Sequence, residues 1–339
     1  MTERSRSSSD LEKKVFLRPI KESTEDYEAI ERHLRELFKK HIYYPILKIL
    51  AEPKTILNSN DSPLIKAIYS GKVGFSNGSF VGAFSADISK ELKAMGAKWD
   101  RATDSWKIRK SILSMEVRSA ISLSEVRFIE RLKSIDEALK KIVPEDLAHQ
   151  FKAEKFFDRT IFRVNRDFER SIRNITIAPK LSMQTRKKLA DEWSNDMKLH
   201  INNFTKSEIQ SLRAKVQKSG LAGKRYESLI STIQKSYSVS ENKAKFLARQ
   251  ETSLMITKLK ESRYKDAGAD RYIWKCVAGT KNHPVRPSHK RLEGTEWSWD
   301  NPPITSEPKQ PTRRNNPGQD FNCRCFARPI VKFKKKKGK

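Results

Sequence analysis

The chain has 339 residues, of which 70 are Lys or Arg and 41 are Asp or Glu, so its formal net charge is +29. Its hydrophobic fraction of 37% and mean hydropathy of −0.72 are typical of a heavily charged, helix-rich protein. No stretch approaches the roughly 20 apolar residues of a membrane-spanning helix, and the polar first residues contain no apolar signal core. These properties exclude a membrane protein and argue against secretion.

The positive charge is the first indication of a partner. A potential of this sign attracts polyanions, and double-stranded DNA bound without sequence preference is the first candidate. Two alternatives stay open: the charges solvate long helices, or they face an acidic protein surface. The run at 332–339 strengthens the case for DNA, because a mobile cationic arm contacts phosphates without reading bases. Its lysines are Lys332, Lys334, Lys335, Lys336, Lys337 and Lys339.

The N-terminal third combines helical and strand-like patterns. After a Ser-rich start at 1–22, which we expect to be disordered, apolar residues at helical spacing predict a helix over about 23–50, interrupted by Pro45 and Pro53. Two short apolar runs then flank Asn77-Gly78, a strong hairpin signal. A helix should follow and end at Gly96, and 99–108 should return as one strand. We therefore predict a hairpin–helix–strand module at about 65–110, within a region spanning 23–110.

The region 111–237 is expected to be helical. Ser219 to Gly223 is a break, and Ser238-Val-Ser-Glu241 reads as a capping box that opens a further helix ending near Asp266. Pro144 and Pro179 separate three apolar stripes, which we interpret as core. The stripes are Ile129, Leu132, Ile135, Leu139 and Ile142; Phe157, Ile161, Val164, Phe168 and Ile172; and Leu189, Trp193, Met197, Ile201 and Phe204.

The region 238–331 carries the chemical clue. All three cysteines and two of the six histidines, His283 and His289, fall within its last part. An odd, clustered set of cysteines excludes a disulfide framework and suits a reducing compartment. If Cys323 and Cys325 lie on a strand, both sulfurs project to one side, and with Cys276 and His289 they supply the three sulfurs and one nitrogen that a structural zinc site accepts. The alternative is that the thiols fill a core while His289 bonds a backbone carbonyl.

Several segments of this region resemble, in the same order, the phage Mu F-like minor head proteins, also called the phage head morphogenesis family. They are Ala244 to Thr252, the strand ending in Trp274, Val285 to His289 with Leu292-Glu-Gly294, and Pro317 to Cys325. The resemblance covers about residues 200–331. The chain departs from the family in having Gln250 where Thr is frequent, and in a long proline-rich loop before Cys323.

The resemblance implies a structural minor head protein of a tailed phage or prophage, incorporated in the procapsid at the portal, inside the capsid, and present in the host cytoplasm during assembly. Its partners would be the portal protein, major capsid or scaffolding proteins and DNA, with no membrane. Such proteins act in head morphogenesis and in DNA packaging or delivery, without catalysis and with no certain cofactor beyond a possible zinc. The residues carried over from the family motifs are Arg249, Glu251, Trp274, Arg286, His289, Gly294, Cys323, Arg324 and Cys325.

These motif residues are expected to build the C-terminal fold. Arg249 and Glu251 would form an ion pair, or Glu251 would accept a bond from Arg286 or Arg324. The fold class expected is α+β: an elongated, mostly helical N-terminal and middle part with the small module, followed by a compact β-rich domain and the tail at 332–339. Two alternatives for function stay open, namely a metal-dependent nuclease using His289 and a DNA-binding protein without a virion role.

Overall fold

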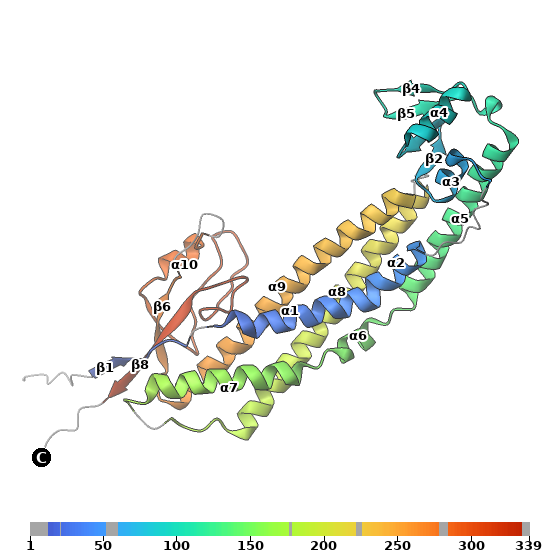
Figure 1. Ribbon diagram of the computed structural model, residues 1–339. Helices are drawn as coiled ribbons and strands as arrows, with labels where there is room; N and C mark the ends of the chain where they lie inside the picture. The colour runs from blue at the N-terminus through green and yellow to red at the C-terminus, as the bar shows by residue number, and fades with distance from the viewer. Residues whose placement is uncertain are drawn as a thin grey trace, which may run out of the picture. The chain divides into compact units, whose positions relative to one another are not determined.

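The computed structural model describes residues 13–20, 22–51, 60–175, 178–221, 226–277 and 284–333 (Figure 1). Long helices and two four-stranded antiparallel sheets confirm the expected α+β class. The chain divides into two compact units. The first comprises 1–33, 151–199 and 245–339, and the second comprises 34–150 and 200–244. Among the helices in the described part of the chain, none is both long and apolar enough to cross a membrane.

The sheet of the first unit has the order β1-β8-β6-β7. Its strands are β1 (Lys13–Phe16), β6 (Arg271–Lys275), β7 (Glu296–Ser298) and β8 (Phe326–Phe333). The expectation of a disordered start is therefore wrong for β1, which pairs with β8 in the register Val15 to Val331. The expected mobile arm is wrong for Lys332, which lies within β8 opposite Lys14, and residues 334–339 of that arm fall outside the described residues.

Helices pack around this sheet in the first unit. Helix α7 (Ala153–Ile172) belongs to it entirely, while α1 (Thr24–Phe38), α8 (Met183–Leu221) and α9 (Tyr226–Asp266) each contribute part of their length. The apolar stripe of α7 is buried, from Phe157 to Ile172, as its spacing predicts. On α8, Trp193 packs against Phe157 with ring centroids 6.3 Å apart.

The second unit contains a π-helical turn just before Pro45, where the sequence predicts an interruption of the first helix. The turn (Lys39–Tyr43) joins α1 to α2 (Tyr44–Ala51) in one continuous helical run, and Pro45 follows it directly. A proline and a π-helical turn are both recognised causes of a helix kink. The buried hydroxyl of Tyr43 donates to Glu208 at 2.5 Å and to the carbonyl of Ser236 at 3.1 Å. Helices α5 (Met115–Lys140) and α6 (Pro144–Gln150) complete this part.

Two predictions for the helices are wrong in detail. Helix α9 begins at Tyr226, so Ser238 lies inside it and does not cap a new helix. Its hydroxyl donates to the carbonyl of Gln234, as serine side chains within helices commonly do. Glu241 pairs with Arg35 at 2.6 Å. Helix α8 continues to Leu221, and the rest of the predicted break falls outside the described residues. On α5, Ile129 is 50% exposed, although Ile135 and Leu139 of the same stripe are buried.

The small module also lies in the second unit, with the sheet order β2-β3-β5-β4. Asn77 and Gly78 both have positive φ, at 49° and 73°, as the predicted hairpin requires. The segment 99–108 forms two strands instead of one, because Asp104 takes φ of 49° and turns the chain back. The elements are α3 (Pro63–Tyr69), β2 (Val73–Ser76), β3 (Ser79–Gly82), α4 (Ala86–Ala94), β4 (Lys98–Asp100) and β5 (Ser105–Lys107), followed by a short 3-10 turn (Lys110–Ile112).

Candidate metal centre

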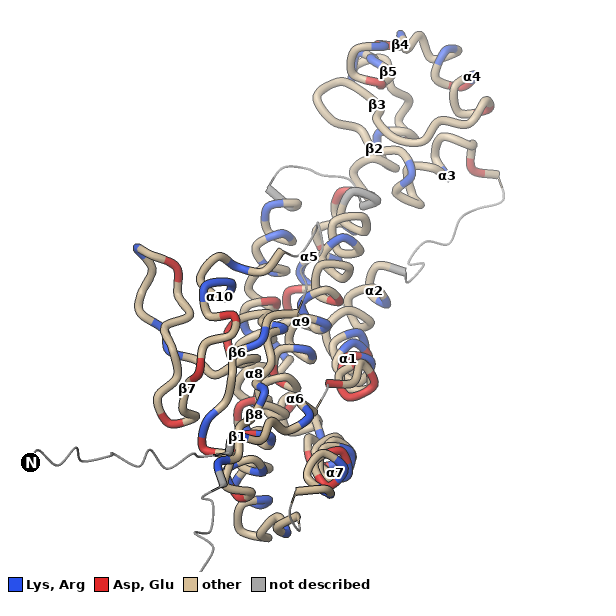
Figure 2. The backbone as a smooth tube through the Cα atoms, turned by 90° about the vertical axis from the view of Figure 1, so that its left-hand side faces the viewer, with Lys and Arg blue, Asp and Glu red and all other residues tan. Residues whose placement is uncertain are grey.

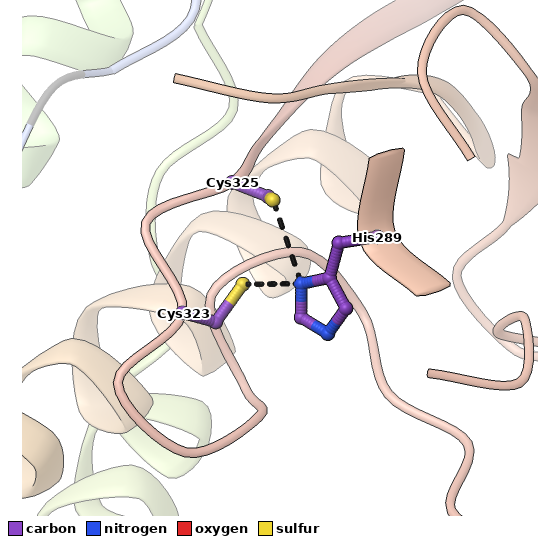
Figure 3. A group of neighbouring side chains, drawn as sticks. All are labelled: His289, Cys323 and Cys325. Carbon is purple, nitrogen blue, oxygen red and sulfur yellow. Dashed lines mark hydrogen bonds between the residues drawn. The ribbon is translucent and has the colours of Figure 1, made fainter. Parts of the chain in front are cut away.

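Three of the four predicted donors meet in the first unit, although they are far apart in the sequence. His289 lies on the short helix α10 (Pro287–Arg291), which begins with Pro287 at its first position. Cys323 and Cys325 lie in the loop just before β8, and both sulfurs point toward the imidazole of His289 (Figure 3). The expectation that this pair stands on a strand is wrong. The exposure of these three residues alternates nevertheless: Cys323 is half-buried, Arg324 is exposed and Cys325 is buried.

The distances define a compact set of donors. Nδ1 of His289 lies 3.4 Å from Sγ of Cys323 and 3.6 Å from Sγ of Cys325. The three ligand atoms all lie within 4.8 Å of one another. Cys276, which follows β6, is at the edge of this group: its sulfur is 3.7 Å from that of Cys325 and 3.3 Å from the carbonyl oxygen of His289.

Asp320 is a residue of this site that sequence reasoning missed. Its carboxylate is 2% exposed, and Oδ2 lies 3.1 Å from Nε2 of His289. The other oxygen accepts from the backbone N–H of Phe321 at 2.8 Å. Two guanidinium groups flank the carboxylate, Arg286 at 3.4 Å and Arg313 at 3.6 Å. Asp320 stands within the family-like segment Pro317 to Cys325, but it is 31 positions from His289, so the spacing along the chain does not indicate the contact.

The protonation states follow from these contacts. The hydrogen bond with Cys325, aided by His289, lowers the pKa of Cys323 to about 5 against the opposing effect of burial. The same bond, with burial, raises the pKa of Cys325. Burial opposes the charged form of His289, but Cys323 and Asp320 outweigh it and raise the pKa of the imidazole. Burial likewise opposes the charged form of Asp320, yet the Phe321 N–H and His289 lower its pKa. The cluster therefore supplies a thiolate at neutral pH, which suits either a soft metal ion or a reactive cysteine.

The residues carried over from the family motifs occupy different places around the cluster. The buried indole of Trp274 meets the His289 ring edge-on at 5.6 Å between centroids. Arg286 pairs with Asp320 and also donates to the carbonyl of Phe321, so its carboxylate partner is not the expected Glu251. Gly294 has φ of +78°, a conformation that glycine adopts without strain.

Two of these motif residues lie on α9. The guanidinium of Arg249 sits over the ring of Tyr27, 5.8 Å from its centroid, whereas Glu251 is buried at 4% exposure. Some predicted residues cannot be placed: His283 and the lysines Lys334, Lys335, Lys336, Lys337 and Lys339 lie outside the described residues.

Comparisons with known proteins bear on the same region. Residues 210–328 match the family described as phage Mu protein F like protein. An uncharacterised protein of Haemophilus influenzae is 25% identical over 131 residues, which are 39% of this chain and 27% of that relative. The chain thus spans about a quarter of the length of the curated relative it matches. No solved structure matches the chain. All the donors, Asp320 and the motif residues fall inside the matched segment, whereas β1 lies outside it.

Proposed function

We propose that this chain, in which residues 210–328 form a phage Mu protein F-like domain, is a structural minor head protein of a tailed bacteriophage or prophage. It would enter the procapsid at the portal, act in head morphogenesis and in DNA packaging or delivery, and reside inside the capsid after assembly in the host cytoplasm. Its partners would be the portal protein and the major capsid or scaffolding proteins. The family match over 210–328 is the observation that carries this proposal.

Charge supports the DNA-binding part of the proposal. The net charge of +29 gives an interior protein an attraction for packed DNA. Lys and Arg are interspersed with Asp and Glu along the helices instead of being confined to the chain end (Figure 2). An excess of positive charge favours contacts with the phosphate backbone over base readout, so we expect binding without sequence preference and with strong salt dependence.

The nuclease alternative finds little support in the geometry of His289. Its Nε2 faces Asp320 and its Nδ1 faces two sulfurs, so both ring nitrogens are engaged by side chains of the chain itself, whereas a general base needs a nitrogen within reach of the proton that it accepts. The ring is also 2% exposed. A scissile phosphate cannot approach a nitrogen held in this way without rearrangement of the loop.

A gel-retardation series tests DNA binding and the nuclease alternative together. Purified protein is mixed with duplex DNA across a salt range, with and without magnesium or zinc. We expect intact DNA and an affinity whose logarithm falls linearly with the logarithm of salt concentration. Replacing the five lysines of 334–339 by Gln should lower the magnitude of the slope by up to about 4.5, at roughly 0.9 per phosphate neutralised, whereas replacing them by Arg should leave it unchanged. Cleavage that His289→Ala abolishes would establish the nuclease instead.

A second experiment distinguishes a head protein from a DNA-binding protein without a virion role. The chain is co-expressed with the portal protein of the same phage or prophage, and the lysate is treated with nuclease and sedimented. We expect the chain to sediment with portal rings after the DNA has been removed. Co-sedimentation that disappears with the DNA would favour a DNA-binding protein without a direct portal contact.

A further inference from the structure

The donor cluster has the dimensions of a tetrahedral zinc site. Bonds of about 2.3 Å from zinc to sulfur and about 2.0–2.1 Å from zinc to nitrogen place sulfur about 3.6 Å from nitrogen and about 3.8 Å from a second sulfur. The two sulfur–nitrogen separations at His289 are 3.4 and 3.6 Å, and the sulfur–sulfur separation between Cys276 and Cys325 is 3.7 Å. These three separations therefore match the distances between ligand atoms in a tetrahedral site of this kind.

The surroundings of His289 match those of a metal-binding histidine. Such a residue usually donates its second ring N–H to a carboxylate, which fixes the tautomer and directs the other nitrogen at the metal. Asp320 lies 3.1 Å from Nε2 and can accept its proton, and in that tautomer the lone pair of Nδ1 would point toward the sulfurs. Asp320 is itself held by the N–H of Phe321 and by the guanidinium of Arg286, and Trp274 packs against the ring.

We propose that Nδ1 of His289 and the thiolates of Cys323, Cys325 and Cys276 hold one structural zinc ion, with Asp320 as the residue that positions the imidazole. Three sulfurs and one nitrogen are a donor set that zinc accepts in tetrahedral geometry, and four protein ligands leave no open position for a substrate. Cys276 completes the set by turning its sulfur, already 3.7 Å from that of Cys325, away from the His289 carbonyl oxygen.

Zinc in this place would tie the helix α10 to the end of β6 and to the loop that leads into β8. The sheet already joins the latter two segments, through the pairing of Lys275 with Phe326. The helix α10 has only five residues, so a metal bond from His289 would add directly to the free energy that holds this helix in place. This proposal concerns the stability of the domain and is independent of the role in head assembly.

Metal analysis of the full-length chain, purified without an affinity tag, tests the proposal directly. We expect about one zinc per chain after desalting, and less than a tenth of that in Cys323→Ser and in Cys325→Ser. His149→Ala, which changes an exposed histidine on α6, is the matched control and should keep the metal. Folded protein, judged by circular dichroism, that contains no zinc and whose Cys323 is alkylated rapidly at neutral pH would overturn the proposal in favour of a metal-free thiolate–imidazolium pair.

Cobalt substitution tests the ligand set even if some variants fold poorly. The wild-type chain loaded with Co²⁺ should show thiolate-to-cobalt charge transfer and the intense visible bands of tetrahedral coordination. Cys276→Ser should lower the charge-transfer intensity by about a third, since one of three thiolates is lost; an unchanged spectrum would remove Cys276 from the set. Asp320→Asn should keep the tetrahedral spectrum but weaken metal binding about 10–100-fold. Octahedral spectra in the wild-type chain would refute the site.

Discussion

Asp26 and Arg163 form a buried ion pair that joins α1 to α7 within the first unit. The Asp26 side chain is 3% exposed and that of Arg163 is 17% exposed. Nε of Arg163 donates to Oδ1 at 3.2 Å, and Nη2 donates to Oδ2, so the pairing is bidentate. Thr160 adds a third donor at 3.4 Å, and Arg163 also reaches Asp167 at 3.3 Å. We predict that Asp26→Asn destabilises this unit strongly.

The expected magnitude follows from the burial of the pair. Removing one partner of a buried ion pair costs roughly 3–5 kcal/mol, because the remaining charge is left uncompensated. Arg163 is slightly exposed and keeps Asp167, so we expect about 2–3 kcal/mol. The neighbouring pair Glu25–Arg159 joins the same two helices, but its side chains are 73% and 62% exposed, and Glu25→Gln should cost at most about 0.5 kcal/mol. Both acids lie in the first turn of α1, so the interaction with the helix dipole cancels in the comparison.

Native-state hydrogen exchange, read by mass spectrometry on peptides of α1 and α7, measures the cost locally. Asp26→Asn should lower the free energy of opening in these peptides by about 2–3 kcal/mol relative to wild type, and Glu25→Gln should leave it nearly unchanged. Replacing Arg163 by Met in the Asp26→Asn background should recover part of the loss, since no buried charge then remains unpaired. Equal values for the two single variants would refute the reasoning.

Three further predictions concern the C-terminal domain. Glu251→Ala, at a carboxylate only 4% exposed, should destabilise the domain by about 2–4 kcal/mol, and an unchanged melting transition would contradict this. Gly318→Ala should lower the melting temperature more than Gly294→Ala, since both have positive φ but only at Gly318 would a Cβ lie 2.7 Å from a buried side-chain oxygen. Glu296 has a pKa lowered from 4.5 by the hydrogen bond from Lys14, so its stabilisation is present above pH 4.5 and is lost as the pH falls through the lowered value. After correction for the intrinsic exchange rate, which itself falls with pH, the protection of β1 against hydrogen exchange should therefore decrease on acidification in wild type and respond less in Glu296→Gln.

The parts predicted well from the sequence depend on local periodicity. The stripe from Phe157 to Ile172 is buried throughout, because residues three and four apart must share one helix face. The hairpin at Asn77-Gly78 is likewise determined by two residues that tolerate positive φ. The division of 99–108 into two strands was harder to predict. The turn between them ends at Asp104, and aspartate is found at positive φ less often than glycine.

The parts that were missed depend on contacts between distant segments. Strand β1 has four residues with no clear alternation, and only its partner β8 makes it a strand. The donors Cys323, Cys325 and His289 were found by residue type, because few side chains suit a soft ion. Asp320 was missed because its role arises from a distance of 3.1 Å to His289 that no spacing along the chain encodes.

The pairing of β1 with β8 also constrains the order in which the protein can fold during synthesis. Lys13–Phe16 leaves the ribosome more than 300 residues before Phe326–Phe333, and β8 is its neighbour in the sheet. Until β8 emerges, β1 has an unpaired backbone, whereas the small module near residue 100 can fold while translation continues. A chain cut short before β8 would leave the first strand without its partner, so only a translation product that extends through β8 acquires the finished sheet.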